Sequence, residues 1–205
     1  AHHHRRNDHR ALQRLLAAAL NKPSKRLDTT AHYLLHRAHL ELTTYAEEPR
    51  ELLAAVVFLA AKVEDEAVSL DDLLPTHADA SRQAILQLEQ RLLDALRFQV
   101  VVRSPRRALT GLIDAFCDAA AVAPTQAARL RADADGFLAE CLCCDAPLLF
   151  SPQQMALAAL LANSATDELV GWLKAQLGSV DGSMRARLEG VRELGARAQA
   201  ADEVR

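Results

Sequence analysis

One unbroken run of apolar residues constrains the fold of this chain more than any other feature. The run AAVVFLAA occupies positions 54–61, and Lys62 and three acids at 64–66 follow almost at once. A helix that is apolar on all sides is a buried helix, and this run is too short to cross a bilayer, which needs about 20 apolar residues. Its alanines let neighbouring helices approach closely, and Pro49 suits a first helical turn. The stretch 49–66 therefore predicts the central helix of a bundle.

The composition favours helix and argues against a broad nucleic-acid surface. Half of the 205 residues are apolar, 25% are charged and only 4% are aromatic, with a shift toward Ala and Leu. The net charge, 24 basic against 27 acidic residues, is −3, which opposes binding to nucleic acid over a large face. No stretch alternates long enough to form a sheet, so the predicted fold class is all-α.

The cysteines and the lack of a recognisable targeting segment indicate the cellular compartment. Of the four cysteines, three lie together at Cys141, Cys143 and Cys144, which is no disulfide framework and favours a reducing intracellular compartment. No segment resembles a signal peptide or a membrane span. The leading AHHHRRNDH is polar and His-rich, either a natural tail or a tag remnant, and we expect it to lie outside the fold.

Helical periodicity divides the first half of the chain into five segments. Asp8 is the expected cap of the first helix, and Asp28, Thr29 or Thr30 that of the second. Ser69 is expected to cap a short segment that Pro75 ends. The predicted helices are 9–20, 28–43, 49–66, 70–74 and 79–98.

The second half repeats this plan after an extended joint. FQVVVRSP at 98–105 is β-branched, and Ser104 before Pro105 is disfavoured in helix. The predicted helices then cover 105–120, 124–143, 152–164, 167–177 and 183 onward, with loops at 145–150 and 178–182. Each half has an Ala-rich third helix, which indicates internal duplication. We therefore expect domains at 9–104 and 105–198 and a tail at 199–205.

Four segments resemble the cyclin family. FLAAKVEDEAVSL is similar to the third helix of the cyclin box, ILQLEQRLLDALRFQV to its fifth helix, and FQVVVRSPRRALTGLIDAF to the join between boxes in transcription-associated cyclins. CDAPLLFSPQQMALAALLANSA is most similar to the cyclin H class. The resemblance covers about 12–198. The chain departs from that class at 105–108, where PRRA replaces an aromatic residue and a second proline, and the helices flanking the boxes look shortened.

The resemblance implies two consecutive five-helix cyclin boxes and a non-catalytic activator. A cyclin holds the C-helix of a cyclin-dependent kinase inward, so that the kinase's own Lys–Glu pair forms around ATP phosphates. Carried over, the kinase-binding residues are Lys62, Glu89, Phe58, Val63 and Glu64. On their own, Lys62 is typical of a helix C-terminus and Glu89 of a solvated helix face.

The same resemblance implies the partners and the compartment. The expected partner is the catalytic subunit of a CDK-activating kinase, together with a RING-finger assembly factor, in a complex that acts on kinase activation loops and on the RNA polymerase II tail in the nucleus. No cofactor, direct nucleic-acid contact or membrane contact is expected.

Three further clusters have competing interpretations. Arg103, Arg106 and Arg107 form a basic group that suits an anion or an acidic partner, or simply a solvated bend. Histidines at 32, 36 and 39 share one helix face; this spacing can ligate a metal, but a helix surface or packed imidazoles fit better. The cysteines at 141–144 lack a second ligand pair at zinc spacing and are interpreted as packed thiols. No metal site is predicted.

Four alternatives stay open on the sequence alone. The chain could instead resemble a cyclin of the C, K, L or T class. A TFIIB-like DNA-binding core uses related five-helix repeats, but the net charge and the acids at 64–66 oppose it. An enzyme is disfavoured, because no Gly-rich phosphate loop, GxSxG or HExxH motif is present. A helical scaffold that has lost its kinase partner would keep the same core.

Overall fold

The structure is a computed structural model that describes residues 2–20, 23–42, 48–74, 79–163, 166–177 and 182–203. Within these ranges all regular structure is helical, which confirms the all-α prediction. Across the same residues, none of the helices combines the length and the apolarity that a membrane crossing requires.

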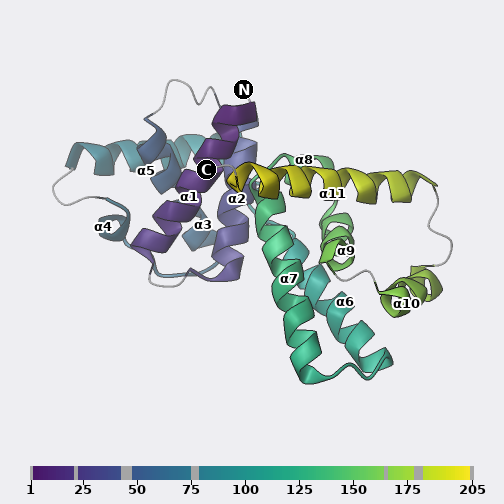
Figure 1. Ribbon diagram of the computed structural model, residues 1–205. Helices are drawn as coiled ribbons and strands as arrows, with labels where there is room; N and C mark the ends of the chain where they lie inside the picture. The colour runs from purple at the N-terminus through teal and green to yellow at the C-terminus, as the bar shows by residue number, and fades with distance from the viewer. Residues whose placement is uncertain are drawn as a thin grey trace. The chain divides into compact units, whose positions relative to one another are not determined.

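The helices are named in chain order. Their bounds are α1 (His2–Ala19), α2 (Lys25–Glu41), α3 (Pro49–Val63), α4 (Leu70–Leu73), α5 (Asp79–Ala95), α6 (Pro105–Ala119), α7 (Pro124–Leu142), α8 (Ala146–Leu149), α9 (Pro152–Asn163), α10 (Asp167–Leu177) and α11 (Gly182–Glu203). The chain divides into two compact units, 1–102 and 103–205. The first holds α1 to α5 and the second α6 to α11 (Figure 1).

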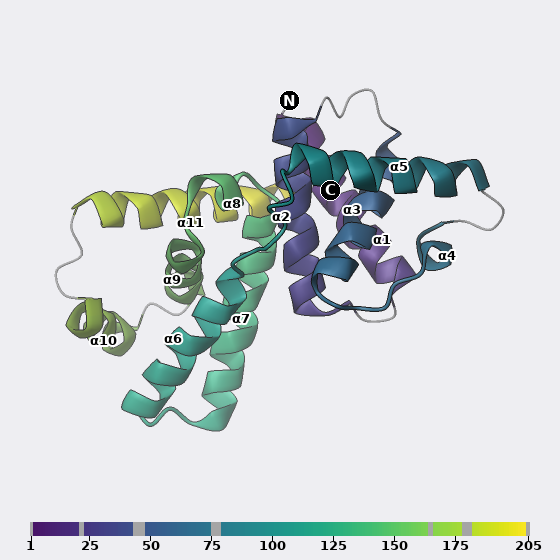
Figure 2. The same cartoon turned by 180° about the vertical axis from the view of Figure 1, so that it is seen from behind.

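Helix α3 is the centre of the first unit. It packs against α1, α2, α4 and α5 (Figures 1 and 2). Nine of its 15 residues are buried, because the apolar run covers its whole circumference. The buried residues are Leu52, Leu53, Ala54, Ala55, Val56, Val57, Leu59, Ala60 and Ala61.

Helix α9 has the corresponding place in the second unit. It packs against α6, α7, α8 and α11, and its residues 155–160 are all buried. Helix α11 approaches α7 closely at Gly195, where an added Cβ would lie 2.5 Å from the Phe137 ring. Trp172 of α10 is half-buried and meets Phe116 of α6 edge-on, with ring centroids 5.6 Å apart.

The start of the chain differs from the sequence prediction. Helix α1 begins at His2, so Asp8 lies inside it and is not its cap. His9 is fully buried, so the polar leading segment takes part in the fold. The physical reason is continuity: no Gly or Pro interrupts residues 2–20, and the buried Leu12 and Leu16 stabilise the turns before them.

The second helix also begins earlier than predicted. Its cap is Ser24, whose hydroxyl accepts a hydrogen bond from the Leu27 amide at 3.0 Å, in place of Asp28, Thr29 or Thr30. Asp28 then lies in the first turn, where its charge favours the helix dipole. The prediction that Ser69 caps the fourth segment is confirmed, with a reciprocal capping box formed with Asp72.

Other helix ends differ for local reasons. Helix α5 ends at Ala95 instead of 98, because Arg97 and Phe98 adopt left-handed backbone conformations with φ of 50° and 57°. The Arg37 guanidinium donates to the carbonyls of Leu96 and Gln99 and so satisfies this end. The predicted loop 145–150 contains the single turn α8, and α11 continues to Glu203, into the expected tail. The expected loop 178–182 lies largely outside the described residues.

Candidate functional site

Helix α3 presents Phe58 and Lys62 on one face, one turn apart. Phe58 is half-buried, and the Lys62 ammonium lies 4.2 Å from the centre of its ring. This cation–π contact holds the flexible lysine side chain over an apolar surface. The two residues therefore form a single feature at the end of the buried helix.

Glu89 of α5 completes this feature. Its Oε1 accepts from Lys62 Nζ at 2.6 Å, and its side chain is only 8% exposed, whereas that of Lys62 is 52% exposed. A carboxylate so poorly solvated needs a partner, since a buried unpaired charge is costly. The two residues predicted as separate contacts are thus brought together as one ion pair with an accessible ammonium.

Leu86 of α5 lies one helical turn before Glu89, on the same side of the helix, and was absent from the sequence prediction. It is 40% exposed, and so is one of several exposed large apolar side chains in this unit, together with Leu40, Phe98 and Val101. The available signal was its position, because a leucine three residues before Glu89 shares that residue's helix face. We call Phe58, Lys62, Leu86 and Glu89 the α3–α5 face.

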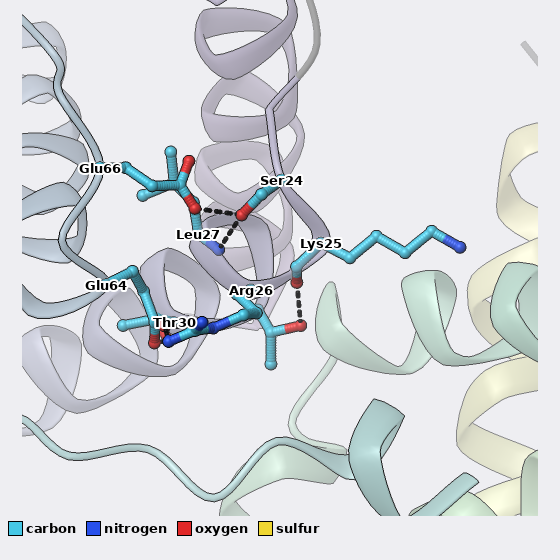
Figure 3. Close-up of polar contacts among 8 residues, drawn as sticks. Ser24, Lys25, Arg26, Leu27, Thr30, Glu64 and Glu66 are labelled. Atoms are coloured by element: carbon cyan, nitrogen blue, oxygen red, sulfur yellow. Dashed lines mark hydrogen bonds and ion pairs between the residues drawn. The ribbon is translucent and has the colours of Figure 1, made fainter. Parts of the chain in front are cut away.

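Glu64, whose predicted contact with a kinase stays a prediction, bonds two residues of α2. Its Oε1 accepts from the Thr30 hydroxyl at 2.6 Å, and its Oε2 accepts from Arg26 Nε and Nη2, each at 2.8 Å (Figure 3). It therefore ties the end of α3 to the first turns of α2. Val63, the last residue of α3, is half-buried against the core.

A second contact joins the start of α2 to the segment after α3, next to the contacts of Glu64. The Ser24 hydroxyl donates to Glu66 while it accepts from the Leu27 amide (Figure 3). Asp65, between the two glutamates, has a φ of 57°, which turns the chain sharply after α3. We call Ser24, Arg26, Thr30, Glu64 and Glu66 the α2–α3 brace. Sequence reasoning missed it because its partners are 34 to 42 residues apart.

The three arginines of the predicted basic group have different surroundings in the structure. Arg106 is paired with Asp135 of α7, and its side chain is 13% exposed. Arg103 and Arg107 are exposed. The contact of this group with an anion or an acidic partner stays a prediction.

The histidine and cysteine clusters are packed groups. His32 and His36 are buried, and no set of side chains suited to holding a metal ion occurs in the ranges that the structure describes. The four cysteines are free thiols, and Cys141 and Cys143 are buried, as the interpretation of packed thiols predicted. Burial, with a smaller contribution from Cys144, raises the pKa of the Cys141 thiol, which keeps it protonated and unreactive.

Comparison with known proteins shows which family this chain resembles in sequence and fold. Residues 104–194 match the family model of the cyclin C-terminal domain. The chain is similar in fold to a chain in the CAK complex from Chaetomium thermophilum bound to ATP-γ-S. The TM-score is 0.80 at 22% identity, and the match covers 94% of this chain and 62% of that one. It is also similar to a chain in the yeast TFIIK (Kin28/Ccl1/Tfb3) complex. The TM-score there is 0.77 at 19% identity, and the match covers 93% of this chain and 84% of that one. The fold is therefore that of a cyclin, and the predicted fold class is confirmed.

Curated proteins of similar sequence indicate which type of cyclin the chain resembles. The chain is 31% identical to Cyclin-H of Xenopus laevis over 150 residues, which are 70% of this chain and 46% of that protein. It is 28% identical to Cyclin-H1-1 of Arabidopsis thaliana over 138 residues, 66% of this chain and 41% of that protein. The chain thus spans less than half the length of these relatives. Its predicted resemblance to cyclins of the H type is confirmed.

Proposed function

We propose that this chain is a cyclin H-like regulatory subunit, without catalytic activity of its own, that binds and activates a cyclin-dependent kinase. The proposed partner is a catalytic subunit of the CDK-activating type, because the chain's relatives are H-type cyclins and its fold is that of chains in the CAK and TFIIK complexes. We further propose that a RING-finger assembly factor joins the complex and that it acts in the nucleus on activation loops and on the RNA polymerase II tail.

The observation that carries the proposal is the α3–α5 face. An accessible ammonium and a poorly solvated carboxylate, 2.6 Å apart, lie beside the half-buried Phe58, and the exposed Leu86 precedes Glu89 by one helical turn. An ammonium can donate to carbonyls at the end of a kinase helix, and a carboxylate can accept from amides at a helix start. In the isolated chain the two groups neutralise each other.

The pairing suggests how this face is prepared for a partner. Because Lys62 is held between the Phe58 ring and Glu89, both groups are already oriented when the kinase arrives. Less side-chain freedom is then lost on binding. The apolar side chains beside the pair would exclude water and strengthen the new contacts. Binding of the kinase C-helix here would favour its inward, active position.

Val63, Glu64 and the arginines have lesser proposed roles. Val63 is only half-buried and adjoins Lys62, so it would contribute apolar contact. Glu64 would act mainly by holding the end of α3 on α2. Arg103 and Arg107, both exposed, stay candidates for an acidic partner segment.

A kinase assay tests the proposal. The chain is mixed with a CDK-activating-type catalytic subunit, with and without the assembly factor, and phosphorylation of an RNA polymerase II tail peptide is followed. We expect stimulation, and we expect Lys62→Ala and Glu89→Ala each to weaken binding by roughly 1–3 kcal/mol, about 5- to 150-fold, because each leaves a desolvated partner group unsatisfied.

Arg131→Ala is the matched control. It breaks an exposed ion pair with Asp114 in the second unit and should leave the stimulation unchanged. Full stimulation by the Lys62→Ala/Glu89→Ala double variant would refute the proposed face. If the folded chain neither binds nor stimulates this kinase, the H-type assignment is wrong, and kinases of the other transcription cyclins are tested next.

A further inference from the structure

Two serines in the sequence stand directly before a proline, and their neighbours differ in charge. Of the seven prolines, Pro105 follows Ser104 and Pro152 follows Ser151, and none follows a threonine. Arginines stand one residue before Ser104 and two and three residues after it, whereas phenylalanine and glutamines take these places around Ser151. The proposed function makes no use of either serine.

Both serines lie at the start of a helix in the second unit. Ser104 caps α6, and its hydroxyl accepts a hydrogen bond from the Arg106 amide at 3.3 Å. Ser151 directly precedes α9, and its hydroxyl accepts from the Gln154 amide, also at 3.3 Å. In each case the proline is the first residue of the helix. The two sites are therefore alike in backbone setting and differ in the charge beside them.

The segment around Ser104 has the features that protein kinases recognise. Residues 99–104 form no helix, and Ser104 has extended backbone angles, with φ of −70° and ψ of 128°. Kinases bind an acceptor serine in an extended segment and select it by neighbouring charge. The proline-directed class takes a serine before proline and favours a basic residue three positions on, the place of the exposed Arg107.

Transfer of a phosphate requires the first turn of α6 to open. Ser104 is half-buried and Pro105 is buried, so the folded turn does not offer both residues to an enzyme. Helix ends are the parts of a helix that open most readily. The turn begins at the end of the chain's extended segment, and opening it extends that segment by one to three residues.

The start of α6 is suited to hold a phosphate once it is attached. Amides of a first helical turn have no carbonyl partner within the helix, and the helix dipole favours negative charge there. The first turn of α6 contains no acidic residue. Arg103 and Arg107 lie on either side of Ser104 in the sequence and are exposed. A phosphate at a helix start beside arginines forms about one to three charge-assisted hydrogen bonds.

The acidic side chain that reaches this end of α6 has a partner of its own. Asp135 of α7 is paired with Arg106, so its charge is compensated, and Arg106 is not counted among the groups that would hold the phosphate. At Ser151 the setting is poorer, since Gln154 already closes its cap by accepting from the Ser151 amide at 3.0 Å. A phosphate there would gain helix amides but no neighbouring arginine in the sequence.

We propose that Ser104 is a phosphorylation site for a proline-directed protein kinase, and that Arg103, Arg107 and the start of α6 hold the phosphate. The Ser104 Oγ bonds to the γ-phosphorus of ATP, and the bond from this phosphorus to the β–γ bridging oxygen breaks. ADP leaves with that oxygen, and the hydroxyl proton passes to the catalytic base of the kinase. The site belongs to the second unit and does not depend on the α3–α5 face.

Treatment of the whole folded chain with ATP and a cyclin-dependent kinase that is active with its own cyclin tests the proposal. Mass spectrometry of peptides from a protease that does not cut at arginine locates each phosphate. We expect phosphate on Ser104, and modification of Ser151 at least about tenfold more slowly, because no arginine follows it. No phosphate on Ser104, or equal rates at the two serines, would overturn the proposal.

Arg107→Gln tests whether charge selects the site. It should slow modification of Ser104 several-fold, whereas the matched Arg187→Gln, at an exposed arginine of α11, should leave the rate unchanged. An equal rate in Arg107→Gln and the unaltered chain would show that the arginine does not select Ser104, contrary to the proposal.

Hydrogen exchange of the modified chain tests whether the start of α6 holds the phosphate. Protection of peptides from this start should rise several-fold relative to α7 peptides, and the rise should shrink at about 1 M salt, which screens the arginines. Ser104→Asn keeps a capping side chain but takes up no phosphate, so kinase treatment should leave its exchange unchanged. No rise in the unaltered chain, or an equal rise in Ser104→Asn, would refute the proposed role of α6.

Discussion

The two units stabilise their helices with different kinds of buried side chain. In the part of the chain that the structure describes, the buried polar or charged residues all belong to the first unit: His9, Thr29, Thr30, His32, His36 and Glu89. The buried residues described in the second unit are apolar: aliphatic, aromatic, thioether or thiol side chains and Gly195. The same duplicated plan thus has a partly polar core in one half and an apolar core in the other.

This difference predicts that the two units respond to different kinds of substitution. Buried polar groups are stable only when each has a partner, so the first unit depends on defined pairs such as Lys62 with Glu89. The second unit depends on close packing around α9, which tolerates little change of volume. We therefore expect the loss of a polar partner to matter most in the first unit and a change of side-chain volume in the second.

The largest expected effect is a cavity in the second unit. Leu138 of α7 is fully buried, and Leu138→Ala should lower the free energy of unfolding by about 2–5 kcal/mol. Urea unfolding followed by Trp172 fluorescence measures it, since this only tryptophan lies in the second unit.

The same loss should appear at pH 6 and at pH 8, because this unit has no histidine. A loss below about 1 kcal/mol, or one that changes strongly between these pH values, would break the contrast between the two cores.

A smaller loss of stability should appear in the second unit at alkaline pH. Because burial raises the pKa of the Cys141 thiol, the folded unit keeps a proton that the unfolded chain releases above about pH 8.5. Stability is fully present below that pH and is lost as the pH rises, by at most about 1.4 kcal/mol per unit for one proton.

Urea unfolding followed by Trp172 fluorescence between pH 7.5 and 10 measures how the free energy of unfolding changes with pH. Cys141→Ala should abolish it, and Cys117→Ala, at a half-buried thiol, should retain it. A slope that persists in Cys141→Ala would assign the alkaline effect to another group.

The smallest expected effect concerns the α2–α3 brace. Thr30→Val removes the hydroxyl that donates to Glu64 and should cost about 1 kcal/mol, the usual net value of such a bond. Hydrogen exchange of α2 and α3 peptides measures the loss.

Thr29→Val is the matched control. Thr29 is equally buried, but its hydroxyl bonds the Lys25 carbonyl within the same helix, so its loss should leave the contact between α2 and α3 intact. Equal effects of the two variants on α3 peptides would show that the brace adds nothing beyond local helix stability.

The elements were predictable where the signal is local. The buried helix over the apolar run 54–61, the cap at Ser69 and the helix 167–177 follow from spacing and capping chemistry, and all three appear in the structure. The errors fall where tertiary contacts decide. Nothing in the composition of the first nine residues indicates that His9 enters the core, since its partners lie 23 or more residues away.

For the candidate site, too, the residues could be predicted from the sequence but their contacts could not. Lys62 and Glu89 were found through resemblance to a family, but their pairing, the buried state of Glu89 and the engagement of Glu64 and Arg106 depend on three-dimensional packing. Periodicity gives the face of a helix on which a residue lies. It does not give the side chain that lies opposite.

The central claim is that the α3–α5 face meets the kinase, and site-specific cross-linking tests it most directly. A photoreactive phenylalanine analogue replaces Leu86 or, as the control, Leu149 of α8, which is also exposed. The chain is then irradiated with the CDK-activating-type catalytic subunit. The account predicts cross-links from position 86 to peptides of the kinase C-helix and few from position 149. Efficient cross-links from 149 with none from 86, in a complex shown to be active, would contradict it.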